Sequence, residues 1–289
     1  MRYETPTALR MALEDRFRLQ AKGTGIPVDR LRRRVMFERI IARLEHSEPG
    51  LWVLKGGMAL EVRLLDDARL TKDMDLGFRD DVASGEALHE RLVEVLRTDP
   101  HGDRFVLQAS QPLQLGEDGG GHLTWRLMVS ASLADRSFGK IQLDVSPRTH
   151  ELSATDRVVV QNSLEFAGVP STTAEIIDVD RHAAEKFHGM IRDFGDRDNS
   201  RVRDLVDLVI LIEHELLHTH ELRVHINSVW SERNNETPPS VLPALPETWP
   251  ARYERLASEH ELSASSFEEA VRIVRQLWSD ANEAQRGSP

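Results

Sequence analysis

The sequence predicts an α/β protein, with a mixed sheet in its N-terminal half and a mainly helical C-terminal half. Two segments favour the sheet, because residues 73–78 and 122–133 alternate between apolar and polar side chains as half-buried strands do. The helical half is favoured by apolar residues that recur at helical spacing from residue 180 onward. We therefore expect a core domain over residues 1–165 and a helical domain over residues 166–289.

Each element follows from a local pattern. Helices are expected where apolar residues recur every three to four positions, and strands where apolar runs are short or alternate. Asp135-Arg136-Ser137 is a turn signal, so the strands on either side of it should form a hairpin. Five prolines within residues 234–250 predict a loop. The expected helices are 5–20, 28–46, 58–65, 82–98, 180–195, 200–218, 220–231 and 265–286, and the expected strands are 51–54, 73–78, 104–110, 122–133 and 138–146.

Composition narrows the function classes. The chain of 289 residues has no cysteine, which excludes disulfides, thiolate zinc sites and cysteine nucleophiles. Its N-terminus lacks the apolar core of a signal peptide and its longest aliphatic run is too short to span a bilayer, so we expect a cytoplasmic protein.

The charge is unevenly distributed. The net charge is −11, yet residues 1–80 hold 16 Lys/Arg against 13 Asp/Glu, which makes that segment +3 and the remainder −14. A run of arginines in the second expected helix gives two interpretations, a phosphate-binding patch or a solvated helix face. The run consists of Arg30, Arg32, Arg33, Arg34, Arg39 and Arg43.

Asp73 and Asp75 are the main candidates for chemistry. On a strand, side chains at positions i and i+2 point to the same face, so these two carboxylates should project together, away from Met74 and Leu76. Two carboxylates held so close repel each other unless a positive charge lies between them. Mg²⁺ suits hard oxygen ligands at this spacing, and it leaves its other positions to water and substrate phosphates.

Two further features accompany the acidic pair. The expected strand 51–54 runs into Lys55-Gly56-Gly57, and glycines between a strand and a helix let the backbone approach a phosphate at the helix N-terminus. Asp144 lies between Leu143 and Val145 in a later strand, so its side chain should face away from theirs. A third carboxylate beside the first two would complete a two-metal site for nucleotidyl transfer, while the alternative is an edge-strand charge.

The helical half supplies a candidate cation. Lys186 lies on an expected amphipathic helix, and Asp204 and Asp207 share one face of the next. An acid that pairs with Lys186 would orient its ammonium toward a triphosphate. The other interpretation is an ordinary ion pair between helices.

In this order the motifs resemble the nucleotidyltransferase superfamily, and more closely the AbiEii and MenT group of nucleotidyltransferase toxins from toxin–antitoxin systems. The resemblance covers roughly residues 50–215. It is carried by Leu54-Lys55-Gly56-Gly57-Met58-Ala59-Leu60, Arg69-Leu70-Thr71-Lys72-Asp73-Met74-Asp75-Leu76, Ala184-Glu185-Lys186-Phe187-His188 and Arg203-Asp204-Leu205-Val206-Asp207-Leu208. The pattern leads us to expect Ala at position 189, and Gly189 departs from it.

The resemblance implies a nucleotidyltransferase-type mixed-sheet core with a helical C-terminal domain closing over a cleft. It implies Mg²⁺-dependent transfer of nucleotides from an NTP to an RNA, with tRNA 3′ ends as the acceptor, so that translation stops, and a cognate antitoxin as partner. The residue roles that it implies follow. Lys55, Gly56 and Gly57 would hold the triphosphate, Thr71 and Lys72 would contact substrate, Asp73, Asp75 and Asp144 would bind two metal ions, and Lys186, held by Asp207, would contact the phosphates.

Two alternatives remain open at this point. His214-Glu215-Leu216-Leu217-His218 matches the H-E-x-x-H pattern of zinc metalloproteases, which requires both histidines on one helix face. The third histidine of the extended motif would fall at position 224, which is Val224. The other alternative is a nucleotide-binding module that recognises a partner without transferring anything.

Overall fold

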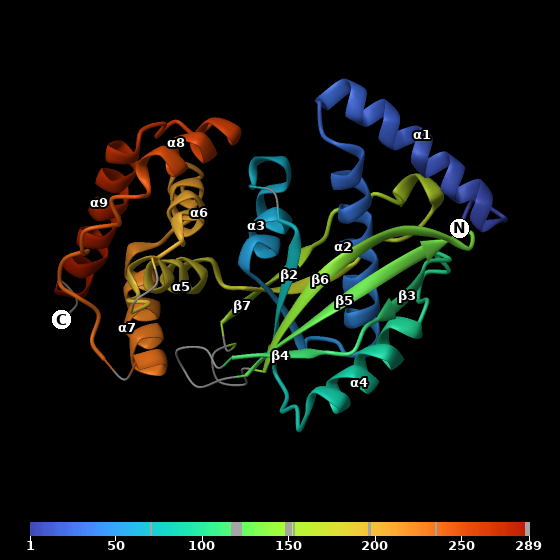
Figure 1. The fold of residues 1–289 in the computed structure, drawn as a ribbon, viewed down its shortest axis with the longest axis horizontal. Helices are drawn as coiled ribbons and strands as arrows, with labels where there is room; N and C mark the ends of the chain where they lie inside the picture. Colours follow the sequence, from blue (N-terminus) through green and yellow to red (C-terminus); the bar gives the residue numbers. More distant parts are fainter. Residues whose placement is uncertain are drawn as a thin grey trace. The chain divides into compact units, whose positions relative to one another are not determined.

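The computed structural model describes residues 1–69, 71–116, 123–147, 152, 154–195, 198–234 and 236–286 (Figure 1). The described chain forms two compact units. The first contains residues 1–65, 71–116 and 123–176, and the second contains residues 66–69 and 177–286. The prediction of a mixed α/β fold with a mainly helical C-terminal part is confirmed.

The first unit is built on one mixed sheet of eight strands, in the order β3-β5-β6-β2-β1-β8-β7, with β4 paired to β5. β2 runs antiparallel to β1 and parallel to β6, and β5 and β6 form the predicted antiparallel hairpin. The strands are β1 (Trp52–Lys55), β2 (Asp73–Phe78), β3 (Val106–Ala109), β4 (Leu113–Leu115), β5 (Thr124–Leu133), β6 (Arg136–Pro147), β7 (Thr155–Val159) and β8 (Thr173–Ile177).

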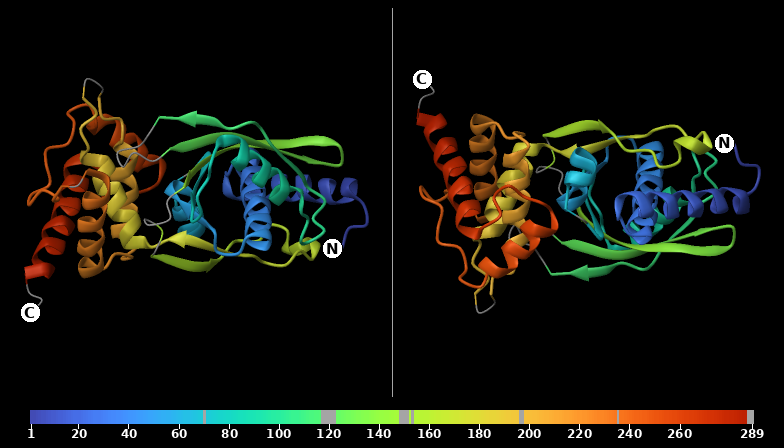
Figure 2. Two further views of the ribbon diagram at one scale, coloured as in Figure 1. Left: turned by 90° about the horizontal axis from the view of Figure 1, so that it is seen from below. Right: turned by 90° about the horizontal axis from the view of Figure 1, so that it is seen from above.

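One face of this sheet forms the core of the first unit. The alternation predicted for β2 is observed, because Met74 and Leu76 are fully buried while Asp73 and Asp75 are half-buried on the other face. α2 packs on β6 and α4, and Figure 2 shows it lying between the β5–β6 hairpin and β7. The helices of this unit are α1 (Pro6–Thr24), α2 (Val28–Ser47), α3 (Gly56–Leu64), α4 (Gly85–Arg97) and the short 3₁₀ turn η2 (Glu165–Ala167), while the 3₁₀ turn η1 (Leu65–Asp67) joins this unit to the second.

The second unit is helical in its described residues. α5 packs against α6 and α7, and α9 packs against α6, α7 and α8. Phe187, Trp230 and Trp278 meet in the core with ring centroids 5.0 and 5.7 Å apart. No described helix has both the length and the apolar character that a bilayer crossing requires. The helices are α5 (Val179–Ile191), α6 (Val202–Glu213), α7 (Thr219–Asn234), α8 (Pro250–Glu259) and α9 (Phe267–Arg286).

Both interpretations of the α2 arginines placed all six on the surface, and this is wrong for three of them. Arg34, Arg39 and Arg43 are buried. Arg43 donates two 2.8 Å hydrogen bonds to Asp103, whose side chain is also inaccessible. A buried guanidinium needs such a bidentate carboxylate, because its desolvation is otherwise uncompensated. These three arginines therefore connect α2 to the core and do not form a surface patch.

Glu38 on α2 is a buried carboxylate that makes stability depend on pH. It accepts hydrogen bonds from the Ser163 amide (2.9 Å) and hydroxyl (2.6 Å), and burial raises the pKa of its carboxyl to about 7. The folded state therefore holds this proton better than the unfolded state, so its stabilising effect is complete below about pH 4.5 and is lost as pH rises through about 7.

We expect Glu38→Gln to flatten the pH dependence of stability in this range. A rise of about 2.5 pKa units corresponds to a loss of about 3 kcal/mol in the wild type between pH 4 and 8. Urea denaturation at several pH values measures it, with Glu90→Gln, an exposed glutamate on α4, as the matched control. Equal slopes for the wild type and Glu38→Gln would contradict the prediction.

Candidate active site on the charged sheet face

A row of charged side chains crosses the sheet at the middle of β2. Asp75 pairs in register with Lys55 on β1 and with Asp144 on β6, and Asp144 pairs with Arg126 on β5. Cross-strand partners share a face, so these four side chains lie on the side opposite Met74 and Leu76. Asp73 joins them because it lies two residues before Asp75. The structure thus brings the three predicted metal ligands to one sheet face.

Gly56 packs directly against Asp75. Its φ is +56°, and a Cβ built on it would lie 1.9 Å from Asp75 Oδ2. Glycine is required at this position for two reasons. An L side chain is strained at this φ, and its Cβ would overlap the carboxylate. Gly56 and Gly57 open α3, whose first backbone N–H groups have no partner within the helix and suit an anion.

We expect Gly56→Ala to impair the acidic site more than the fold. The methyl group would push the Asp75 carboxylate aside, and the left-handed backbone would add about 1–2 kcal/mol of strain. Gly25→Ala is the matched control, since Gly25 has φ +75° but has nothing within 4 Å of a built Cβ. Both variants should lose similar stability by thermal denaturation, and only Gly56→Ala should lose divalent-metal binding by calorimetry. Equal metal binding in both would contradict this reading of Gly56.

Asp144 is held by an arginine. Arg126 Nε and Nη2 donate to its two oxygens at 2.9 and 2.7 Å. Within the described residues, no three His, Asp or Glu side chains are arranged as a ready metal cluster. The chemistry of Asp73, Asp75 and Asp144 nevertheless suits Mg²⁺, because it prefers carboxylate oxygens and takes most of its remaining ligands from water and phosphate. That these residues bind metal stays a prediction.

The segment before β2 is anchored to the helices of the first unit. The Thr71 hydroxyl donates to the Asp73 carbonyl at 3.0 Å, and Arg33 donates to the Thr71 carbonyl at 3.4 Å. Thr71 is buried and Lys72 is exposed beside the acidic pair. The buried Glu61 on α3 holds the Thr71 amide, and its charge faces Arg34, 3.7 Å away. Glu61 therefore helps to fix where β2 begins, although no sequence motif pointed to it.

Lys186 lies in a buried charge cluster in the second unit. Its Nζ is 2.7 Å from Asp207 and 3.2 Å from Asp204. Burial lowers the pKa of Lys186, but the two carboxylates outweigh it, so this pKa is raised. Arg69 also binds Asp207, through Nε at 2.5 Å and Nη2 at 3.0 Å. The pairing of Lys186 with an acid on the next helix is as expected, whereas the role of Arg69 was missed.

Gly189 also has a structural reason. A Cβ on it would lie 2.8 Å from Asp204 Oδ2 and 2.9 Å from Arg201 Nη2. Arg201 itself pairs with Asp204 at 2.5 Å. Alanine at this position would crowd that ion pair, so the departure from the expected pattern preserves the surroundings of Lys186.

The H-E-x-x-H pattern is not a zinc site. α6 ends at Glu213, and Glu215 has φ +53°, so the two histidines do not share a helix face. His218 Nδ1 instead lies 3.0 Å from Asp180, which also accepts the His218 backbone N–H. The predicted helix 200–218 is wrong in its last turn, and the metalloprotease alternative is overturned with it.

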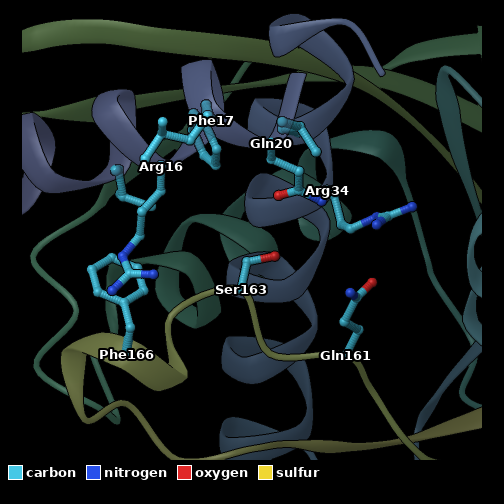
Figure 3. A pocket seen from close by; sticks show the side chains of 10 residues that line it. Arg16, Phe17, Gln20, Arg34, Gln161, Ser163 and Phe166 are labelled. Carbon is cyan, nitrogen blue, oxygen red and sulfur yellow. The ribbon is translucent and has the colours of Figure 1, made fainter. Parts of the chain in front are cut away.

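One cavity of about 350 Å³ lies in the first unit between α1, α2 and residues 161–166 (Figure 3). Arg16 and Arg34 line it together with apolar side chains of α1, and the Arg16 guanidinium stacks 3.9 Å from the centre of the Phe166 ring. None of the predicted site residues lines it. The charged row of the sheet in the first unit and the cluster around Lys186 in the second unit are therefore two separate candidate sites, and neither includes this cavity.

Comparisons with known proteins confirm the predicted family. Residues 39–273 match the model of the family described as nucleotidyl transferase AbiEii toxin, type IV toxin–antitoxin system. The fold is similar to that of MenT4, the nucleotidyltransferase toxin Rv2826c from Mycobacterium tuberculosis H37Rv, with a TM-score of 0.57, 17% identity and coverage of 93% of this chain and 92% of that one. A putative nucleotidyltransferase from H. pylori matches with a TM-score of 0.42 and 14% identity over 90% of this chain and 95% of that one. No curated protein matches the chain.

Proposed function

Because the chain belongs to the AbiEii family of nucleotidyltransferase toxins, we propose that it transfers a nucleotide from an NTP to the 3′ end of tRNA in a Mg²⁺-dependent reaction. The observation that carries this proposal is the row of Lys55, Asp75 and Asp144 on the sheet face opposite Met74 and Leu76, with Gly56 packed on Asp75. A toxin–antitoxin family also implies a cognate antitoxin as partner.

In the proposed site, Asp73 and Asp75 hold the metal ions and Asp144 contributes a third carboxylate. Bound Mg²⁺ would neutralise the phosphate charge that develops during transfer. The first amides of α3, at Gly56 and Gly57, would receive phosphate oxygens, because a helix N-terminus favours anions. Lys55 ends β1 beside Asp75 and would balance its charge.

The proposed role of Lys186 is to hold a triphosphate oxygen. An ammonium has three N–H groups, and the two carboxylates of Asp204 and Asp207 engage two of them. Asp207 and Asp204 would thereby keep the ammonium charged and in one orientation. Extension of the tRNA 3′ end would prevent aminoacylation, so we propose that the protein stops translation in the cytoplasm.

The test is incubation of the folded protein with each α-labelled NTP, Mg²⁺ and total tRNA. We expect label in tRNA with at least one NTP, none after addition of EDTA, and none with tRNA whose 3′ terminal ribose has been oxidised. Absence of label with all four NTPs would reject the transfer to tRNA, and label in protein alone would reject RNA as the acceptor. Binding of an NTP without transfer, together with a stable protein complex, would favour a partner-recognition module.

A further inference from the structure

Arg126 is the cation that pairs with Asp144 on the charged face of the sheet. It lies opposite Asp144 in the β5–β6 register and engages both of its oxygens, while Asp75 lies on the other side of Asp144. Lys55 follows beyond Asp75. The row therefore reads cation, carboxylate, carboxylate, cation across four adjacent strands.

The surroundings of Arg126 connect it to the whole acidic group. The hydrogen bonds to Asp144 raise the pKa of Arg126, and the charges of Asp144, Asp73 and Asp75 act in the same direction. Its side chain is 41% exposed, against 14% for Asp144. An ion pair that is this open to water contributes little to folding, so stability alone does not account for a bidentate arginine on a proposed metal ligand.

We propose that Arg126 competes with the divalent cation for Asp144, so that metal binding has to release this arginine. The inference rests on the proposed metal-dependent function. A guanidinium has no lone pair to offer a metal ion, and it repels one that approaches the same carboxylate. Once released, the guanidinium lies next to the bound metal, where the NTP brings its phosphate charges. Arg126 thus acts on the metal through Asp144, by lowering the affinity of the empty site for the ion.

Calorimetric titration of the full chain with Mn²⁺ tests the proposal without any catalytic turnover. We expect Arg126→Gln to bind Mn²⁺ at least about tenfold more tightly than the wild type. The matched control is Lys140→Gln, which also removes one positive charge. Lys140 lies on the face of β6 that carries Asp144. Lys140 lies four residues before Asp144, about 13 Å away, where salt screens most of its effect. We expect less than about a threefold change in that variant.

A second comparison separates competition from a general charge effect. In an Asp144→Asn background, Arg126→Gln should raise the affinity for Mn²⁺ by no more than the Lys140→Gln control does, because the carboxylate that Arg126 and the metal share is gone. Thermal denaturation of each variant verifies that it is folded.

The outcomes are distinct. If the wild type binds Mn²⁺ and Arg126→Gln binds it equally or more weakly, Arg126 orients Asp144 and does not compete for it, and the proposal is overturned while the metal-dependent function stands. If neither the wild type nor Arg126→Gln binds Mn²⁺, both are overturned. Binding by Arg126→Gln alone supports the proposal.

Discussion

Asp75→Asn is expected to abolish nucleotide transfer while leaving the protein folded. Asp75 lies at the centre of the charged row, in register with Lys55 and Asp144 and in contact with Gly56. Asparagine keeps the shape of the side chain but removes the negative charge that holds a divalent metal. We expect transfer to fall by about a thousandfold or more, which corresponds to about 4 kcal/mol of activation free energy.

The assay is incorporation of labelled NTP into total tRNA at saturating Mg²⁺. Asp81→Asn is the control, because Asp81 is exposed in the segment after β2 and the change is chemically identical. It should retain full activity. Wild-type rates for Asp75→Asn would show that the charged row is not the site of transfer.

The face of Asp73 and Asp75 could be predicted from period-two alternation alone. Met74, Leu76 and Phe78 are apolar at alternate positions, and burying them fixes where the carboxylates point. The Gly-Gly turn could be predicted too, but Gly-Gly is common in turns, so it indicated a phosphate site only in combination with the acidic pair that follows it. Alternation along β5 and β6 likewise placed Asp144 opposite Leu143 and Val145.

Arg126 shows where such reasoning stops. Counting pairs back from a two-residue turn at Ala134 and Asp135 would set Arg126 opposite Leu143, and only a bulge restores Asp144 as its partner. The register shift lies between Ala131 and Ser132, a position that no sequence pattern marked. The alternation of β5 was the available signal. Arg126 belongs to the polar face of β5, and a pairing with the buried Leu143 would have placed it on the apolar face.

Tertiary contacts explain the remaining differences between the predicted and the observed structure. The strands β4, β7 and β8 are short and have weak alternation, and they form because neighbouring strands pair with them. α8 begins at Pro250, and the buried Trp249 before it donates to the Asn199 carbonyl at 2.7 Å. The arginines of α2 look like one surface patch when only the sequence is considered, but Glu61 and Asp103 on distant segments pair with Arg34 and Arg43, which are core residues.

Asp207→Asn is expected to be the most destabilising single change in the second unit, at about 3–5 kcal/mol. The Asp207 carboxylate is fully buried between Lys186 and Arg69. Burial raises its pKa, but the charges of Lys186 and Arg69 outweigh that effect and hold the pKa well below its usual range. Asparagine preserves the shape, so the loss reports the buried Lys186 and the largely buried Arg69 left without their shared anion.

The pH dependence of this loss has a definite sign. Since the folded pKa of Asp207 is depressed, its stabilising effect is complete above the unfolded value of about 4 and is lost only as pH falls through the folded value. The difference between the wild type and Asp207→Asn should therefore be constant from about pH 5 to 8 and shrink in strongly acidic solution. Urea denaturation across this range measures it, with the exposed Asp198→Asn as control.

A double variant distinguishes uncompensated charge from lost hydrogen bonding. Lys186→Met in the Asp207→Asn background removes the buried one of the two cations, so it should recover part of the stability that Asp207→Asn loses. If the double variant is instead less stable than Asp207→Asn alone, Lys186 contributes through Asp204, 3.2 Å away, and not through Asp207. Transfer activity should be absent from both variants, because each one removes a member of the charge pair that is proposed to hold the triphosphate.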